Sequence, residues 1–178
     1  MPVWCRLLTV ARFRLDVFNQ VQVLDLTATD ADLNGFQQGF SDGSYGYLAP
    51  NHNGARFGKV AQFSRGAISQ VQVLDLTTTD PDLKGFIGGI SAGPYGYLAP
   101  LSNNGALFGK VAQFRLDVFS QVQVLDFTTT KPTLKGFMGA SALGHGYLAP
   151  NNNGAHLARW HSSGPFEPGM SGNMVLTS

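Results

Sequence analysis

Cysteine and charge are both scarce in this sequence. Cys5 is the only cysteine, which excludes an internal disulfide and a zinc site built from several thiolates. Charged residues make up 13% of the 178 residues, and 12 basic against 11 acidic side chains leave a net charge of +1. Without a basic excess, the chain has no electrostatic reason to bind nucleic acid or an anionic membrane. We therefore expect no nucleic-acid partner, and a surface that other proteins can cover at little desolvation cost.

An uncharged segment, residues 85–109, is long enough to span a bilayer. It contains Pro94, Pro100 and several glycines, and the equivalent segment of an earlier repeat contains Asp42 and Arg56. In lipid, a helix with this content would leave backbone groups unpaired. The sequence therefore predicts no transmembrane segment.

Repetition is what the chain has in abundance. "VQVLDLT" stands at 21–27 and 71–77 and returns as "VQVLDFT" at 122–128, while "GYLAP" occurs three times. Self-comparison gives one repeat domain over 1–178. It consists of an N-terminal partial strand at 1–12, a C-terminal non-repeat tail at 161–178, and the units 13–62, 63–113 and 114–160 between them. A fixed period of this length is typical of blades, trefoils and solenoids.

Each unit predicts four short antiparallel strands. "QVQVLDL" is β-branched and alternating, so Val71 and Val73 should point to one face and Leu74 and Leu76 to the other. "YGYLAP", "FGKVAQF" and the weaker "GFQQGFS" supply the other three strands. No window carries a helical stripe of apolar residues. The predicted fold class is all-β.

Turn residues agree with the strands. Asn-Gly pairs stand at 53–54, 104–105 and 153–154, each between the "GYLAP" strand and the strand after it. Asn-Gly favours positive φ at both central positions, as a type I′ hairpin requires. We therefore expect a hairpin at each pair.

Four antiparallel strands in about fifty residues correspond to one propeller blade. Propellers typically have about four to eight blades, so three units leave two arrangements open. One is an open arc of three blades with end faces that something must cover. The other is a closed three-fold fold of the β-trefoil or β-prism type, which a strand from one end, such as "VARF" at 10–13, would help to close.

The run "GGISAGPYGYLAP…NNGALFGKVAQF…VQVLDLTTTDPDLKGF" resembles blade-like, propeller-type tandem repeats in predicted proteins of unicellular algae. The resemblance covers residues 10–160. It implies a repeat architecture without a defined activity. The expectation that follows from it is a peripheral subunit of an algal organelle assembly, such as a photosynthetic complex, with a chloroplast location.

The best metal candidate is "DADLNG" at 30–35. Asp30, Asp32 and Asn34 match the start of a calcium loop. The glutamate required at the twelfth position is replaced by Ser41, and the second unit has Lys84 at a ligand position. The alternative is an Asx-type turn in which the carboxylates accept nearby backbone N–H groups.

Tyrosines and asparagines recur in all three units and are the only repeated candidate for a ligand site. They could form sugar-binding platforms on the rim, or the tyrosines could belong to the core. The residues are Tyr45, Tyr47, Asn53, Tyr95, Tyr97, Asn104, Tyr147 and Asn153.

The C-terminal part of the chain offers a different kind of contact. Trp160, Phe166, Met170 and Met174 are apolar residues that could cap a sheet edge or contact a partner.

No catalytic constellation stands out, so we expect no enzyme and no cofactor. "GMSGN" at 169–173 is similar to a serine nucleophile among glycines, but no strand-to-helix turn precedes it. Two functions remain. The first is a non-catalytic structural or accessory subunit that binds other protein subunits of a larger assembly through its β-repeat surface. The alternative is a lectin-like carbohydrate-binding module with up to three equivalent loop sites.

Overall fold

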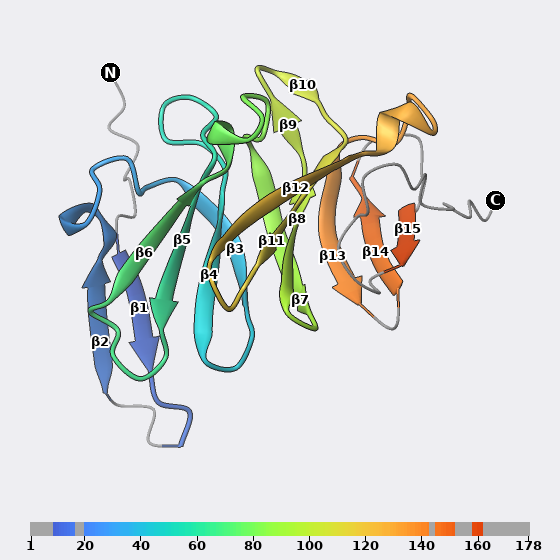
Figure 1. Cartoon of the computed structure of the whole chain (residues 1–178). Helices are drawn as coiled ribbons and strands as arrows, with labels where there is room; N and C mark the ends of the chain where they lie inside the picture. Colours follow the sequence, from blue (N-terminus) through green and yellow to red (C-terminus); the bar gives the residue numbers. More distant parts are fainter. Residues whose placement is uncertain (1–8, 17–19, 143–144, 152–157, 162–178) are drawn as a thin grey trace.

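The computed structural model describes residues 9–16, 20–142, 145–151 and 158–161 (Figure 1). These residues form antiparallel sheets of two to four strands and three short 3-10 turns, with no α-helix among them. The predicted all-β class is confirmed. Within the described ranges no helix has the length and apolar character needed to cross a membrane.

Two four-stranded sheets occupy the middle of the molecule. The first has the order β3-β4-β5-β6, with β3 (Phe36–Ser41), β4 (Tyr45–Pro50), β5 (Lys59–Ser64) and β6 (Val71–Asp75). The second has the order β12-β11-β8-β7, with β7 (Phe86–Ala92), β8 (Tyr95–Pro100), β11 (Lys110–Arg115) and β12 (Ser120–Asp126). The short β9 (Ser102–Asn103) and β10 (Ala106–Leu107) form a hairpin beside the second sheet.

Smaller sheets stand at the two ends. One pairs β1 (Thr9–Phe13) with β2 (Val21–Asp25), and the other has the order β13-β14-β15, with β13 (Phe137–Ala142), β14 (His145–Pro150) and β15 (Ala158–His161). Figure 1 shows the sheets in a row, with β1 and β2 at one end and β13 to β15 at the other. The first strands of successive sheets, β3, β7 and β13, lie next to one another. Ser91 on β7 links two of them by donating its hydroxyl to the Ser41 carbonyl at 2.8 Å.

The sheets are out of phase with the units read from the sequence. Each full sheet begins at the "GF" strand and ends at "VQVLD", so β6 closes one sheet although it lies in the second sequence unit. Hairpin pairing within the sheet, rather than the start of the duplicated segment, sets this phase. The β1–β2 sheet therefore corresponds to the third and fourth strands of a full sheet.

The "VQVLDLT" strand is shorter than the sequence predicts. It ends at Asp25, Asp75 and Asp126, where the 3-10 turns η1 (Leu26–Ala28), η2 (Leu76–Thr78) and η3 (Phe127–Thr129) begin. In each case the aspartate accepts the backbone N–H and the hydroxyl of the threonine two residues on, at 2.9 and 2.6 Å. The side-chain cap stops the strand.

The core lies between successive sheets, in three apolar clusters. Val71 and Val73 pack toward the β1–β2 sheet, whereas Leu74 and Leu76 pack toward the β7–β12 sheet. The predicted division of this strand between two faces is confirmed. In the β7–β12 sheet, Phe114 is fully buried between the two large sheets and Val111 packs on the opposite face.

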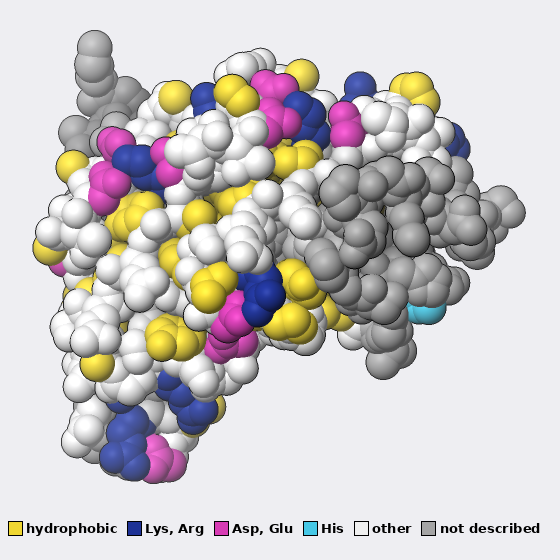
Figure 2. Space-filling model, in the orientation of Figure 1, with side chains coloured by type: hydrophobic (Ala, Val, Ile, Leu, Met, Phe, Trp, Pro, Cys, Tyr) yellow, Lys and Arg dark blue, Asp and Glu magenta, His cyan; other side chains and the backbone are white. Residues whose placement is uncertain are grey.

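Figure 2 shows one face of the molecule, where apolar side chains gather in the middle and charged side chains form small mixed groups. Basic and acidic residues stand beside each other in these groups instead of forming a patch of one sign. This agrees with the net charge of +1.

Candidate interaction surface

The β1–β2 sheet exposes residues that the larger sheets cover. Its register is that of β5 and β6, since Phe13 pairs with Val21 as Phe63 pairs with Val71. Val21 and Val23 are 65% and 64% exposed, whereas their equivalents in β6 and β12 pack against apolar clusters. We call the surface formed by Ala11, Phe13, Val21 and Val23 the end face.

The end face is exposed because the opposite face of the same sheet does the packing. Val10, Leu24 and Leu26 join the cluster that covers β3 to β6. Strand side chains alternate between faces, so residues 11, 13, 21 and 23 must point outward. Val21 and Val23 are more exposed than Phe13, and Ala11 and Phe13 also line the groove beside β1.

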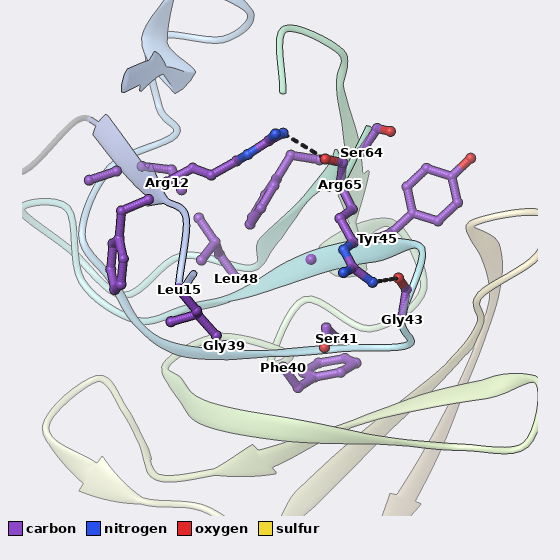
Figure 3. Close-up of a pocket in the computed structure, with 15 residues that line it drawn as sticks. Arg12, Leu15, Gly39, Phe40, Ser41, Gly43, Tyr45, Leu48, Ser64 and Arg65 are labelled. Carbon is purple, nitrogen blue, oxygen red and sulfur yellow. Dashed lines mark hydrogen bonds between the residues drawn. The ribbon is translucent and has the colours of Figure 1, made fainter. Parts of the chain in front are cut away.

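A groove lies beside β1, with a volume of about 640 Å³ (Figure 3). Its walls are largely apolar and include Phe40, Leu48 and Phe63 from β3, β4 and β5. Arg12 donates to the Arg65 carbonyl at 2.6 Å, and Arg65 donates to the Gly43 carbonyl at 3.3 Å. The groove exists because, among the described residues, the β1–β2 sheet has no counterpart of the first two strands of a full sheet.

The opposite end of the row exposes the complementary side of the repeat. Tyr47 and Tyr97 are buried between sheets, but their equivalent Tyr147 on β14 is only half-buried. Ala149 is exposed, although Ala49 and Ala99 are fully buried. The β1–β2 end therefore exposes one face of the repeated sheet, and the β13–β15 end exposes the other face.

Two of the predicted ligand tyrosines belong to the core instead. The Tyr47 hydroxyl donates to Asp42 at 2.7 Å and accepts from Gln62 at 3.1 Å. Gln113 makes the equivalent contact to Tyr97 at 2.8 Å. Burial raises the pKa of both tyrosines. Neither ring is available to stack on a sugar.

The remaining tyrosines and the asparagines do not converge. Tyr45 begins β4 and lines the groove, whereas Asn53 follows the other end of that strand. β4 has six residues, so its ends lie about 17 Å apart. Tyr95 is buried, and its ring lies 6.0 Å from the guanidinium of Arg115.

The asparagine loops serve the fold. Asn53 donates its side-chain amide to the Asp32 carbonyl at 3.0 Å, and the equivalent contact to Asp82 comes from Asn103 rather than Asn104. Asn104 and Gly105 have φ values of 48° and 80°, which confirms the Asn-Gly hairpin there. At Asn53, φ is not positive, so the first loop is a different turn.

Several predicted contacts lie outside the described residues. They are Asn153, Phe166, Met170 and Met174. The backbone of Trp160 lies in β15, where it pairs with Gly146.

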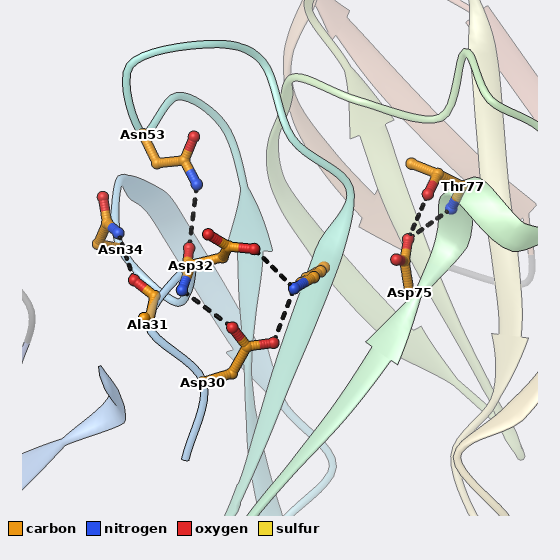
Figure 4. Close-up of polar contacts among 8 residues, drawn as sticks. Asp30, Ala31, Asp32, Asn34, Asn53, Asp75 and Thr77 are labelled. Atoms are coloured by element: carbon orange, nitrogen blue, oxygen red, sulfur yellow. Dashed lines mark hydrogen bonds and ion pairs between the residues drawn. The ribbon is translucent and has the colours of Figure 1, made fainter. Parts of the chain in front are cut away.

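The acidic pair proposed as a calcium site contacts a lysine. The Lys59 ammonium lies 2.7 Å from Asp30 and 2.8 Å from Asp32 (Figure 4). Asn34 is buried and donates to the Ala31 carbonyl at 3.1 Å. A cationic side chain thus stands where the calcium hypothesis places an ion, and no group of three or more acidic, His or Cys side chains suited to a metal occurs in the part of the chain described.

The second full sheet repeats this arrangement, with Lys110 at 2.8 Å from Asp80 and 2.9 Å from Asp82. Hydrogen bonds from Lys59 and Lys110 lower the pKa of Asp30 and Asp80, respectively. Each lysine begins the third strand of a sheet, and each aspartate pair lies in the segment that leads into that sheet. Each ion pair therefore holds the segment that precedes a sheet against the third strand of that sheet.

Acid should weaken these ion pairs. Because the pKa of Asp80 is lower in the folded chain than its ordinary 3.8, the pair stabilises the fold above that value, and the stabilisation is lost as pH falls through the folded pKa. We expect Lys110→Met to cost about 1 kcal/mol at pH 7 and less at pH 3, in urea unfolding at both pH values. Lys135→Met, at an exposed position, is the control. An equal loss at both pH values would contradict the ion-pair role.

No family model matches the sequence, and no curated protein is significantly similar to it.

Proposed function

We propose that this protein is a non-catalytic interaction module, an open row of propeller-blade-like sheets that binds other protein subunits through its ends. The exposure of Val21 and Val23 on the end face, at positions that the larger sheets cover, is the observation that carries the proposal. The groove beside β1 extends this surface with further apolar side chains.

The chemistry of the surface favours protein as the partner. A flat apolar sheet face gains about 1.5–3 kcal/mol for each Val, Leu or Phe side chain that a partner buries fully. The end face offers few of the amide and carboxylate groups by which a sugar is bound. The two arginines of the adjoining groove, Arg12 and Arg65, donate to backbone carbonyls. Another β-rich protein surface, with its own apolar face, matches the end face best.

The alternative lectin-like function finds less support in the geometry. Its sites require tyrosine rings beside asparagine amides, but Tyr47 and Tyr97 are buried and Tyr45 lies at the other end of β4 from Asn53. No arrangement of the described residues favours a sugar over a protein partner.

Site-specific photo-crosslinking tests the proposal. With benzoylphenylalanine in place of Val23 in the full chain, in the cells that make it, we expect crosslinks to protein. The control is the same substitution at Val118, an apolar residue that is also exposed, at 56%, but lies in the turn between β11 and β12. Crosslinks of equal strength at both positions, or none at position 23, would contradict an interaction role for the end face.

A further inference from the structure

We propose that the partner at the end face is a second copy of this chain, whose β14 pairs with the outer edge of β1. This inference rests on the proposed interaction role and names the occupant. In each four-stranded sheet, the third strand has the second strand on one side and the fourth on the other. Among the described residues, β1 has only the fourth-strand equivalent, β2, beside it. The vacant edge of β1 is the one to which a second strand binds.

The sequence of β1 fits β14 in particular. The segments of β5 and β11 contain "VAQF", but β1 contains "VARF", and the sequence reads "LARW" at 157–160, where β15, the strand that pairs with β14, begins at Ala158. Arginine thus replaces the buried glutamine in both. Arg159 lies opposite Tyr147 in the register of β14 and β15, and β1 would place Arg12 at that same position.

The polar contacts of the repeat are preserved in such a pairing. In the full sheets a glutamine donates to the tyrosine hydroxyl directly across the strands, Gln62 to Tyr47 and Gln113 to Tyr97. An arginine side chain carries only donors, so the Arg12 guanidinium of one copy can donate to the Tyr147 hydroxyl of the other as the glutamine amide does in the full sheets. Tyr147 is half-buried, unlike the fully buried Tyr47 and Tyr97.

In the structure β15 pairs with β14 on the edge that β1 would take, so the exchange requires β15 of one copy to give up this pairing to β1 of the other. When β1 of one copy takes the place of β15 in the other, β14 keeps the register that it has with β15. β2, which pairs with β1, then becomes the fourth strand of the sheet. The resulting order, β13-β14-β1-β2, is that of the two full sheets. β14 would lie along the groove beside β1. By analogy with Leu48, Val71 and Val73, the Val21 and Val23 side chains would lie on the same face of the composite sheet as Leu148, which packs against the β7–β12 sheet.

Two copies can close the arrangement. Their two junctions are equivalent by two-fold symmetry, since each copy offers one β1–β2 end and one β13–β14 end. Two full sheets from each copy and two composite sheets make six. A ring of six four-stranded sheets lies within the usual range of about four to eight for propellers. The partner is therefore a second copy in a closed dimer.

Disulfide trapping tests the register. By analogy with β4 and β5, Arg12 of one copy lies opposite Tyr147 of the other. We would mix two differently tagged full-length chains, Arg12→Cys and Tyr147→Cys, each also carrying Cys5→Ser, and expect a disulfide between them on oxidation. Within one chain these positions lie at opposite ends of the row (Figure 1). The control replaces Tyr147→Cys by Ala149→Cys, on the same face but about 7 Å further along the strand, beyond disulfide reach.

Light scattering of the unmodified chain accompanies the trapping. A dimeric unmodified chain, together with a disulfide for the 12–147 pair and little for the 12–149 pair, supports the proposal. The double variant Val21→Lys, Val23→Lys changes two exposed residues of the end face, and its conversion to a monomer supports the proposal as well. A monomer at every concentration overturns it. A dimer in which the 12–147 pair stays reduced overturns the strand pairing. A monomer that still gives photo-crosslinks to other proteins at position 23 refutes self-association and leaves the proposed function standing.

Discussion

Gly85→Ala is expected to destabilise the protein by about 3 kcal/mol or more, a large part of the stability of an ordinary domain. Gly85 has a φ of +72°, and a Cβ built on it would stand 1.9 Å from the carbonyl oxygen of Ser102. The backbone N–H of the same Ser102 donates to the Gly85 carbonyl at 3.1 Å, which holds the two segments together. The clash cannot be relieved without breaking this hydrogen bond. We therefore expect a lower urea concentration at the unfolding midpoint, with an unchanged dependence of the unfolding free energy on urea concentration.

Gly105→Ala is the matched control for this experiment. Its φ of +80° is as unfavourable for alanine, but a Cβ there meets nothing within 4 Å. It should cost about 1 kcal/mol, the backbone preference alone. Similar losses at both positions would show that the approach of Ser102 to Gly85 contributes nothing. Gly35 occupies the equivalent place in the first full sheet, with a φ of +74° and the His52 carbonyl at 1.8 Å.

Phe114→Ala should also be severe, at about 3–5 kcal/mol. Phe114 is fully buried between the two large sheets, and its ring contacts those of Tyr47 and Phe119 at centroid distances of 6.1 and 5.9 Å. The ring also lies over Gly96, where a Cβ would come within 2.7 Å of it. Removing the ring leaves a cavity that the strands on both sides cannot fill.

The repeat supplies the control for Phe114. Phe13 holds the same place in β1 as Phe114 holds in β11, but it is 49% exposed. Phe13→Ala should therefore cost about 1 kcal/mol in thermal or urea unfolding of the isolated chain at low concentration. If the two variants lost equal stability, burial between sheets would not be the source of the effect.

The sequence by itself determined the elements of the fold. Alternation in "VQVLDLT" was enough to assign Val71 and Val73 to one face and Leu74 and Leu76 to the other, because side-chain direction in a strand depends only on position. Asn104-Gly105 forms the hairpin that its backbone preference predicts, whereas the same pair at Asn53-Gly54 forms a different turn, so the dipeptide favours the hairpin without fixing it. The "DLT" caps were also local, and the aspartate two residues before each threonine was the signal that would have revealed them.

Only the tertiary structure decided which copies of the repeat are covered. Val21 and Val71 stand in identical local sequence, yet one is exposed and the other packs in a cluster, because coverage depends on what lies beyond the sheet. Tyr45 and Asn53 are eight residues apart in the chain, but an extended strand separates them. Lys59 reaches Asp30 across the start of a sheet, a contact at long sequence separation that no local pattern encodes. Near-identical repeats specify identical strands, and their place in the row gives each strand its own environment.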